Sequence, residues 1–143
     1  MPKPDFTGTW TFNRDKSRLQ IPAPDATVFV VDHREQELRI SRTHVARDRR
    51  DTFSIDLTTD GREVSVDRAD VRLWCRASWD GDTLVFDTRL VRAGEEATNA
   101  VRYTLASDGR TFSAEERFRS GSMNYDNIWV LDKASPVERD SDH

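Results

Sequence analysis

Four side chains that could carry out acid–base chemistry fall at alternating positions among apolar residues. They are Arg42, His44, Tyr103 and Glu116. Histidine changes its charge near neutral pH, so His44 could act as a general acid or base tuned by Glu116. Arg42 or Tyr103 could bind a developing oxyanion. Such a set is typical of a cofactor-independent proton transfer, isomerisation or cyclisation on a hydrophobic substrate.

The sequence alternates with a period of two, which places these side chains on apolar faces of the predicted strands, because every second residue of a strand points to the same side. Arg42 and His44 share a face with Leu38 and Ile40, Tyr103 with Asn99, Val101 and Leu105, and Glu116 with Phe112, Ala114 and Phe118. An unpaired interior charge is costly, so Arg42 and Glu116 are expected to pair with each other or to bind a ligand. For His44 the alternative is a solvated position at the rim, beside the polar turn at 46–49.

The same alternation predicts strands along most of the chain. They cover residues 6–12, 27–31, 37–45, 51–58, 71–79, 83–91, 97–105, 111–119 and 124–131. Residues 63–79 form either one bent strand or two strands broken at 67–70, and the count of ten is favoured over nine. Glycine-containing turns such as Asp80-Gly81 and Asp108-Gly109 separate consecutive strands, as in an up-and-down meander. After the first strand, Asn13 is expected to cap a short helical turn.

A sheet of about ten antiparallel strands has two long free edges unless it closes. We therefore predict an all-β fold, a single antiparallel up-and-down β-barrel over residues 1–134 with a short helical turn after the first strand. A barrel of this size is wide enough to leave an interior cavity. Residues 135–143 are polar and are expected to form a disordered tail.

The first strand carries a motif, Phe6-x-Gly8-Thr9-Trp10, that resembles the opening of the calycins. This superfamily comprises the lipocalins and fatty-acid-binding proteins, and the chain looks most like the fatty-acid-binding branch and small bacterial lipocalin-like proteins. The resemblance implies a basic side chain packed over Trp10. The candidates for that side chain are Arg117, Arg119 and Lys133.

Two features depart from the fatty-acid-binding pattern. The Arg-x-Tyr that holds a carboxylate in the last strand of that family is replaced by Trp129 and Leu131. The helix-turn-helix lid needs more residues than lie between Asn13 and Pro24. Fatty-acid transport is therefore not what the resemblance implies here, even with a barrel of the same kind.

Composition limits the partners and the location that we expect. The net charge is −4 with both signs interspersed, so a nucleic-acid partner is not expected. No apolar run approaches membrane-spanning length, and no signal peptide is recognised, so we expect a cytoplasmic protein without a membrane partner. The single cysteine, Cys75, and the scattered histidines predict no metal site and no cofactor.

Three functions fit this sequence. The favoured one is the binding of a small hydrophobic or aromatic molecule inside the barrel, by a carrier or sensor that is a monomer or a homodimer. The residues expected to contact that molecule are Leu38, Ile40, Arg42, His44, Phe53, Ile55, Leu73, Phe86, Tyr103, Phe112, Glu116, Phe118 and Trp129. The alternatives are a barrel enzyme that uses His44 and Glu116, and a filled barrel that acts as an interaction module with an exposed apolar patch.

Overall fold

Ten antiparallel strands form one continuous sheet in the computed structural model, which describes residues 3–134. The strands are β1 (Gly8–Phe12), β2 (Ala26–Arg34), β3 (Glu37–Ala46), β4 (Arg49–Thr58), β5 (Val64–Arg68), β6 (Val71–Asp80), β7 (Thr83–Arg92), β8 (Glu95–Leu105), β9 (Thr111–Ser120) and β10 (Asn124–Lys133). A turn at residues 69–70 separates β5 from β6, which confirms the count of ten. The predicted tail at 135–143 lies outside the described residues.

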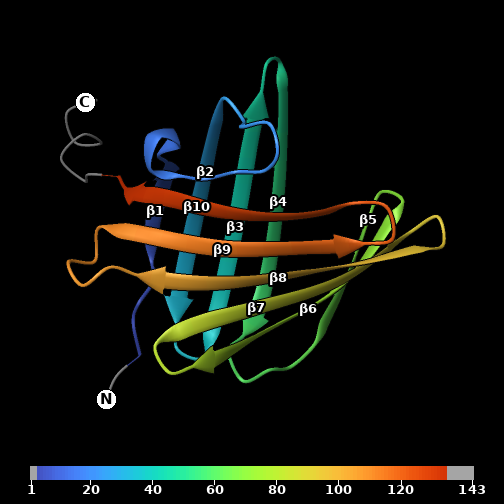
Figure 1. The fold of residues 1–143 in the computed structure, drawn as a ribbon. Coiled ribbons are helices and arrows are strands. Elements are labelled where there is room, and N and C mark those ends of the chain that lie inside the picture. The colour runs from blue at the N-terminus through green and yellow to red at the C-terminus, as the bar shows by residue number, and fades with distance from the viewer. Residues whose placement is uncertain (1–2, 135–143) are drawn as a thin grey trace.

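The strand order is β4-β3-β2-β1-β10-β9-β8-β7-β6-β5. Every strand except the two at the ends of this order is hydrogen-bonded on both sides, and β1 joins the last strand to the first half of the sheet. In Figure 1, β1–β4 run across the direction of β6–β10, so that the sheet curls back over itself. The predicted all-β up-and-down barrel is therefore confirmed, with β4 and β5 facing each other across a gap in a nearly closed wall.

The first strand has a glycine where a lysine side chain crosses the backbone. A Cβ atom at Gly8 would lie 3.0 Å from Lys133 Cε, and Gly8 has a φ of +149°, which residues with a side chain rarely adopt. Lys133 Nζ lies 5.6 Å from the ring centroid of Trp10, within the range of a cation–π interaction. Of the three basic candidates, Lys133 is the one that packs over Trp10.

The segment that follows β1 extends the sheet along β10. Asn13 caps the 3-10 helix η1 (Arg14–Lys16), and its Oδ1 accepts a hydrogen bond of 3.2 Å from the Lys16 amide. This is the predicted helical turn, confined to three residues. Beyond it, the Arg18 and Ile128 backbones pair, and the Asn13 amide donates to the Val130 carbonyl, so the connection continues along the edge of β10.

Aromatic side chains fill one end of the barrel, which we call the closed end. The largest fully buried side chains there are Phe6, Trp10, Phe86, Tyr103 and Phe112, and Phe29 packs with them. Their rings meet at centroid distances of 5.0–6.0 Å in tilted or edge-to-face pairs. This is a packed core, and aromatic pairs of this geometry stabilise it beyond the burial of their area.

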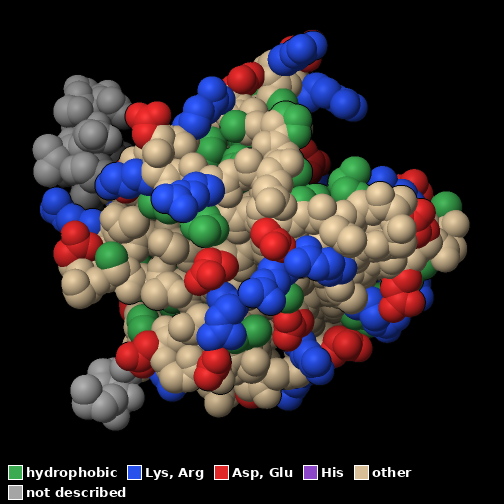
Figure 2. All heavy atoms as spheres, in the orientation of Figure 1, with side chains coloured by type: hydrophobic (Ala, Val, Ile, Leu, Met, Phe, Trp, Pro, Cys, Tyr) green, Lys and Arg blue, Asp and Glu red, His purple; other side chains and the backbone are tan. Residues whose placement is uncertain are grey.

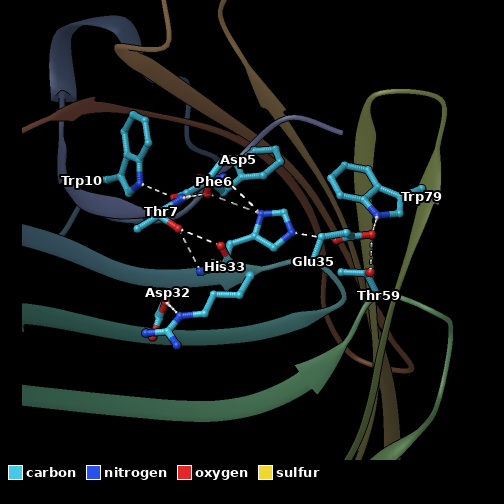
Figure 3. A network of polar contacts seen from close by, with 10 residues as sticks. Asp5, Phe6, Thr7, Trp10, Asp32, His33, Glu35, Thr59 and Trp79 are labelled. Carbon is cyan, nitrogen blue, oxygen red and sulfur yellow. Dashed lines mark hydrogen bonds and ion pairs between the residues drawn. The ribbon is translucent and has the colours of Figure 1, made fainter. Parts of the chain in front are cut away.

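A buried histidine anchors the N-terminal segment to the closed end (Figure 3). His33 Nδ1 accepts from the Phe6 amide at 3.2 Å, so the neutral ring carries its proton on Nε2 and donates it to Glu35 Oε1 at 2.9 Å. Glu35 Oε2 in turn accepts from Trp79 Nε1 at 2.9 Å and from Thr59 Oγ1 at 3.0 Å. Burial alone would raise the pKa of Glu35, but these hydrogen bonds lower it.

The outer surface is polar and mixed in charge. On the face in Figure 2, which includes the outer side of β7–β10, basic and acidic side chains are interspersed. Arg102 pairs with Asp80 and Arg119 with Asp126, both at 2.8 Å. None of the helices in residues 3–134 combines the length and the hydropathy needed to cross a membrane.

Candidate ligand-binding site

The end of the barrel opposite the aromatic core holds a cavity of about 720 Å³, which we call the open-end cavity. Its lining comes from β4–β9, from the turn between β5 and β6 and from the turn after β9. The apolar part consists of Val71, Leu73, Leu90, Ala97 and Phe118, and the rim includes Asp51, Arg68, Asp70, Arg92, Glu95, Ser120, Ser122 and Met123. Met123 is 57% exposed at this rim. A cavity of this size, with apolar walls and a charged rim, is typical of a small-molecule site.

Below this cavity lies a layer of polar side chains centred on Glu116. Its Oε1 accepts from Asn127 Nδ2 and from Trp129 Nε1, and its Oε2 accepts from Asn99 Nδ2, all at 2.9 Å. The donors come from β8 and β10, the two neighbours of β9 in the sheet. Three donors hold this carboxylate in place and satisfy its acceptors inside the barrel.

Arg42 extends from β3 into the same layer. Its Cζ lies 5.2 Å from the ring centroid of Phe53 on the adjacent strand β4 and 5.5 Å from that of Phe86 on β7. Within residues 3–134, its guanidinium makes no hydrogen bond and no ion pair, and its Nε is buried without a partner. Of the two alternatives for Arg42 and Glu116, an ion pair between them is therefore not formed.

His44 follows Arg42 by two residues on β3, on the side nearer the open end. Its Nδ1 is 2.8 Å from Thr27 Oγ1, and its ring centroid is 5.7 Å from that of Trp129. Burial lowers the pKa of His44, the Arg42 charge lowers it further, and Asp51 and Glu116 partly offset both effects. The ring is therefore held toward its neutral form.

Two other interior groups have raised pKa values. Burial raises the pKa of Tyr103, whose side chain is 1% exposed and whose hydroxyl has no hydrogen-bond partner. Burial also raises the pKa of the Cys75 thiol, which accepts a hydrogen bond from Thr88 at 3.5 Å. A thiol held in this way is a poor nucleophile.

The thirteen residues predicted to contact a ligand divide into three groups. Leu73 and Phe118 line the open-end cavity. Arg42, His44, Phe53, Glu116 and Trp129 lie in or beside the polar layer. Leu38, Ile40, Ile55, Phe86, Tyr103 and Phe112 belong to the buried core, each at most 4% exposed. None of Arg42, His44, Tyr103 and Glu116 is hydrogen-bonded to another of the four, so they do not form a catalytic relay in this structure.

Several residues of the site were absent from the prediction. Leu90 and Ala97 share the inward faces of Phe86 and Tyr103, so the alternation of their strands could have identified them. Asn127 is 1% exposed and donates to Glu116, but two competing apolar faces hid the orientation of its strand. Arg68 lies in the stretch where the strand boundary was ambiguous, and no signal pointed to it.

No protein-family model matches this sequence, and no curated protein sequence matches it significantly. Solved structures do match. Human cRBP IV is 14% identical with a TM-score of 0.61, over 92% of this chain and 99% of that one. Zebrafish ileal bile acid-binding protein, solved with cholic acid, is 10% identical with a TM-score of 0.60, over 90% and 98%. Secretory abundant heat soluble protein 4 from Ramazzottius varieornatus is 15% identical with a TM-score of 0.53, over 91% and 95%.

These likenesses define the class of fold. The chain has the same kind of barrel fold as these proteins, which agrees with the resemblance of its first strand to that of the calycins. More particularly, its ten-stranded, nearly closed barrel matches cRBP IV and the bile acid-binding protein over nearly their whole lengths.

Proposed function

We propose that this protein binds a small hydrophobic or aromatic molecule in the open-end cavity, as a carrier or a sensor. The observation that supports this most directly is a cavity of about 720 Å³ walled by Leu73, Leu90, Ala97 and Phe118. Each Å² of apolar surface that a ligand removes from water there contributes about 25 cal/mol before the costs of association. A protein of the same fold has been solved with cholic acid, a molecule with a large apolar body.

The proposed contacts of the ligand combine the cavity walls with the polar layer below. Leu73 and Phe118 would contact its apolar body, and Phe53 and Trp129 would offer aromatic surface at the base. We also propose that the protein is cytoplasmic and that it is a monomer or a homodimer. A related fold from Ramazzottius varieornatus was crystallised from a dimer sample.

The test uses N-phenyl-1-naphthylamine, a neutral probe whose fluorescence rises in apolar surroundings. Ala97 is 5% exposed and lines the cavity, so Ala97→Trp should fill the cavity and abolish saturable binding. Ala100 lies on the outer side of the same strand and is exposed, so Ala100→Trp is the matched control and should bind as the wild type does. Equal binding by all three proteins, or no binding by the wild type, would contradict the proposal.

A further inference from the structure

The edge of β4 that faces the gap in the barrel wall carries backbone groups that no other strand uses. In an antiparallel pair, residues hydrogen-bonded to the partner strand alternate with residues whose N–H and C=O groups point away from it. The Thr59 amide donates to the Gln36 carbonyl at 2.9 Å, so the odd-numbered residues of β4 bond to β3. The even-numbered residues, which include Ser54, Asp56 and Thr58, therefore face the gap.

One contact across the gap agrees with this assignment. Arg68 of β5 donates to the Thr52 carbonyl at 3.1 Å, and Thr52 is the next even-numbered residue toward the open end. β5 thus reaches β4 through the length of an arginine side chain and not through its own backbone, which leaves room between the two strands. Among residues 3–134, no hydrogen bond across this gap reaches the backbone of Ser54, Asp56 or Thr58.

This part of the edge lacks the features that usually prevent a strand from pairing further. Sheet edges are commonly blocked by a proline, by a bulge or by a covering segment. β4 contains no proline and no glycine, and its ten residues pair with β3 in one unbroken register. Arg68 spans the open-end half of the gap, whereas the closed-end half, from Ser54 to Thr58, has no such contact within the described residues.

A groove of about 530 Å³ runs along the closed-end half of this edge. Its lining includes Asp56, Leu57 and Thr58 of β4, Val64 of β5 and Arg62 just before β5, so the groove lies in the gap between the two strands. Leu57 is buried and Val64 is half-buried. A strand placed in this groove would therefore meet apolar surface on the side that points toward the barrel interior.

The charged side chains of the groove are mostly paired with one another. Four of the six form the ion pairs Arg34–Asp32 and Arg39–Asp56. The other two, Glu37 and Arg62, form no ion pair among residues 3–134. A partner that places an acidic residue beside Arg62 would therefore be complementary in charge, whereas the balance of signs gives no advantage to a strongly charged partner.

We propose that the closed-end half of the β4 edge binds an extended peptide segment of a partner protein, which adds to the sheet as a strand antiparallel to β4. Its backbone would exchange hydrogen bonds with Ser54, Asp56 and Thr58, which span about 13 Å and so match a segment of about five residues. Its alternate side chains would point toward Leu57 and Val64. A flexible segment fits this edge better than a second copy of the chain does, because the β4 edge of the copy would face its own β5 in the same way.

The experiment measures binding of the peptide Glu-Val-Lys-Val-Thr, labelled with fluorescein, by fluorescence anisotropy. A generic peptide is sufficient because the proposed recognition uses the backbone, and its two valines would point inward. Wild type should bind it saturably with a Kd below about 1 mM. The control is the same peptide with N-methyl groups on its Glu, Lys and Thr, whose amides would face β4. It should bind at least about tenfold more weakly, because each lost hydrogen bond contributes about threefold to tenfold.

Ser54→Pro tests the same contact from the side of the protein. Proline removes the amide that faces the gap and leaves the odd-numbered residues of β4 bonded to β3, as an edge strand tolerates. This variant should bind the peptide at least about tenfold more weakly than wild type does. The matched control, Ser54→Ala, removes only the hydroxyl and should bind the peptide as wild type does.

The groove lies outside the open-end cavity, so binding there does not depend on the function proposed above. No saturable binding by wild type, or equal binding of the peptide and its N-methylated form, would overturn the proposal, even if Ser54→Pro does not fold. Displacement of the peptide by N-phenyl-1-naphthylamine would place it in the open-end cavity and would also overturn the proposal. Self-association of wild type that Ser54→Pro abolishes would assign the edge to a second copy instead.

Discussion

Replacing Glu35 by Ala tests whether the polar network at the closed end stabilises the fold. The change removes the acceptor of three hydrogen bonds, of which those from His33 and Thr59 come from buried side chains. The His33 residue is 6% exposed and Thr59 is 4% exposed, so neither can turn to water when its partner is lost. Leaving a buried donor unpaired costs about 1–3 kcal/mol, so Glu35→Ala should lower the free energy of unfolding by about 2–4 kcal/mol in total.

The assay is urea denaturation followed by tryptophan fluorescence, with Glu37→Ala as the control. Glu37 is exposed at the start of β3, so its replacement should change the free energy of unfolding by less than about 0.5 kcal/mol. Glu35→Gln keeps one carbonyl acceptor and should fall between Glu35→Ala and wild type. A Glu35→Ala protein as stable as Glu37→Ala would refute the reasoning, because it would show that the buried donors lose nothing with their acceptor.

Two further predictions concern other positions in the barrel. Burial and the Arg42 charge lower the pKa of His44 below its ordinary 6.5, so as pH falls through that value the unfolded chain takes up a proton that the folded chain binds more weakly. The free energy of unfolding should therefore decrease between about pH 7 and about pH 5.5. Urea denaturation at both pH values should show a smaller decrease for His44→Gln than for wild type. Equal decreases would contradict this prediction. Gly8→Ala should lower the free energy of unfolding by about 1–3 kcal/mol, because alanine would have to keep the positive φ of Gly8. Thermal melting should show the same loss when Gly8→Ala is made in a Lys133→Ala background. If the stability recovers in that background, the cost comes from the contact with Lys133 instead.

The barrel could be predicted from the sequence because its strands alternate and its turns contain glycine. The face shared by Leu38, Ile40 and Arg42 follows from a period of two alone, and the structure places that face inside. The contact of Lys133 with Trp10 could be named only as one of three options, because it depends on how β10 closes onto β1. Periodicity within one strand does not specify a partner on another.

The orientation of β10 could not be predicted because both of its faces carry apolar side chains. Trp129 and Leu131 point inward, opposite Ala114 and Phe112 of β9. Val130 points outward, yet it is only 9% exposed, and its carbonyl accepts a hydrogen bond from the Asn13 amide of the connection after β1. Two apolar faces on one strand remove the alternation on which such a prediction depends.

The extent of the cavity also could not be predicted from the sequence. A ten-stranded barrel predicts internal space, but the way in which rings such as Phe6 and Phe29 fill one half depends on side-chain packing. The same holds for Glu116, whose three donors come from two neighbouring strands. Their convergence is a property of the strand register, which no single stretch of sequence encodes.

The gap between β4 and β5 has a consequence for how the barrel wall can respond to its contents. Within the described residues no backbone hydrogen bond joins these strands, and Arg68 spans the gap through its contacts with Asp51 at 2.5 Å and with the Thr52 carbonyl at 3.1 Å. The circumference of the barrel can therefore increase at this seam by the loss of side-chain contacts alone, while the nine strand pairings stay intact. Slow amide hydrogen exchange throughout β7–β9 and fast exchange along the facing edges of β4 and β5 would indicate that the gap opens in this way.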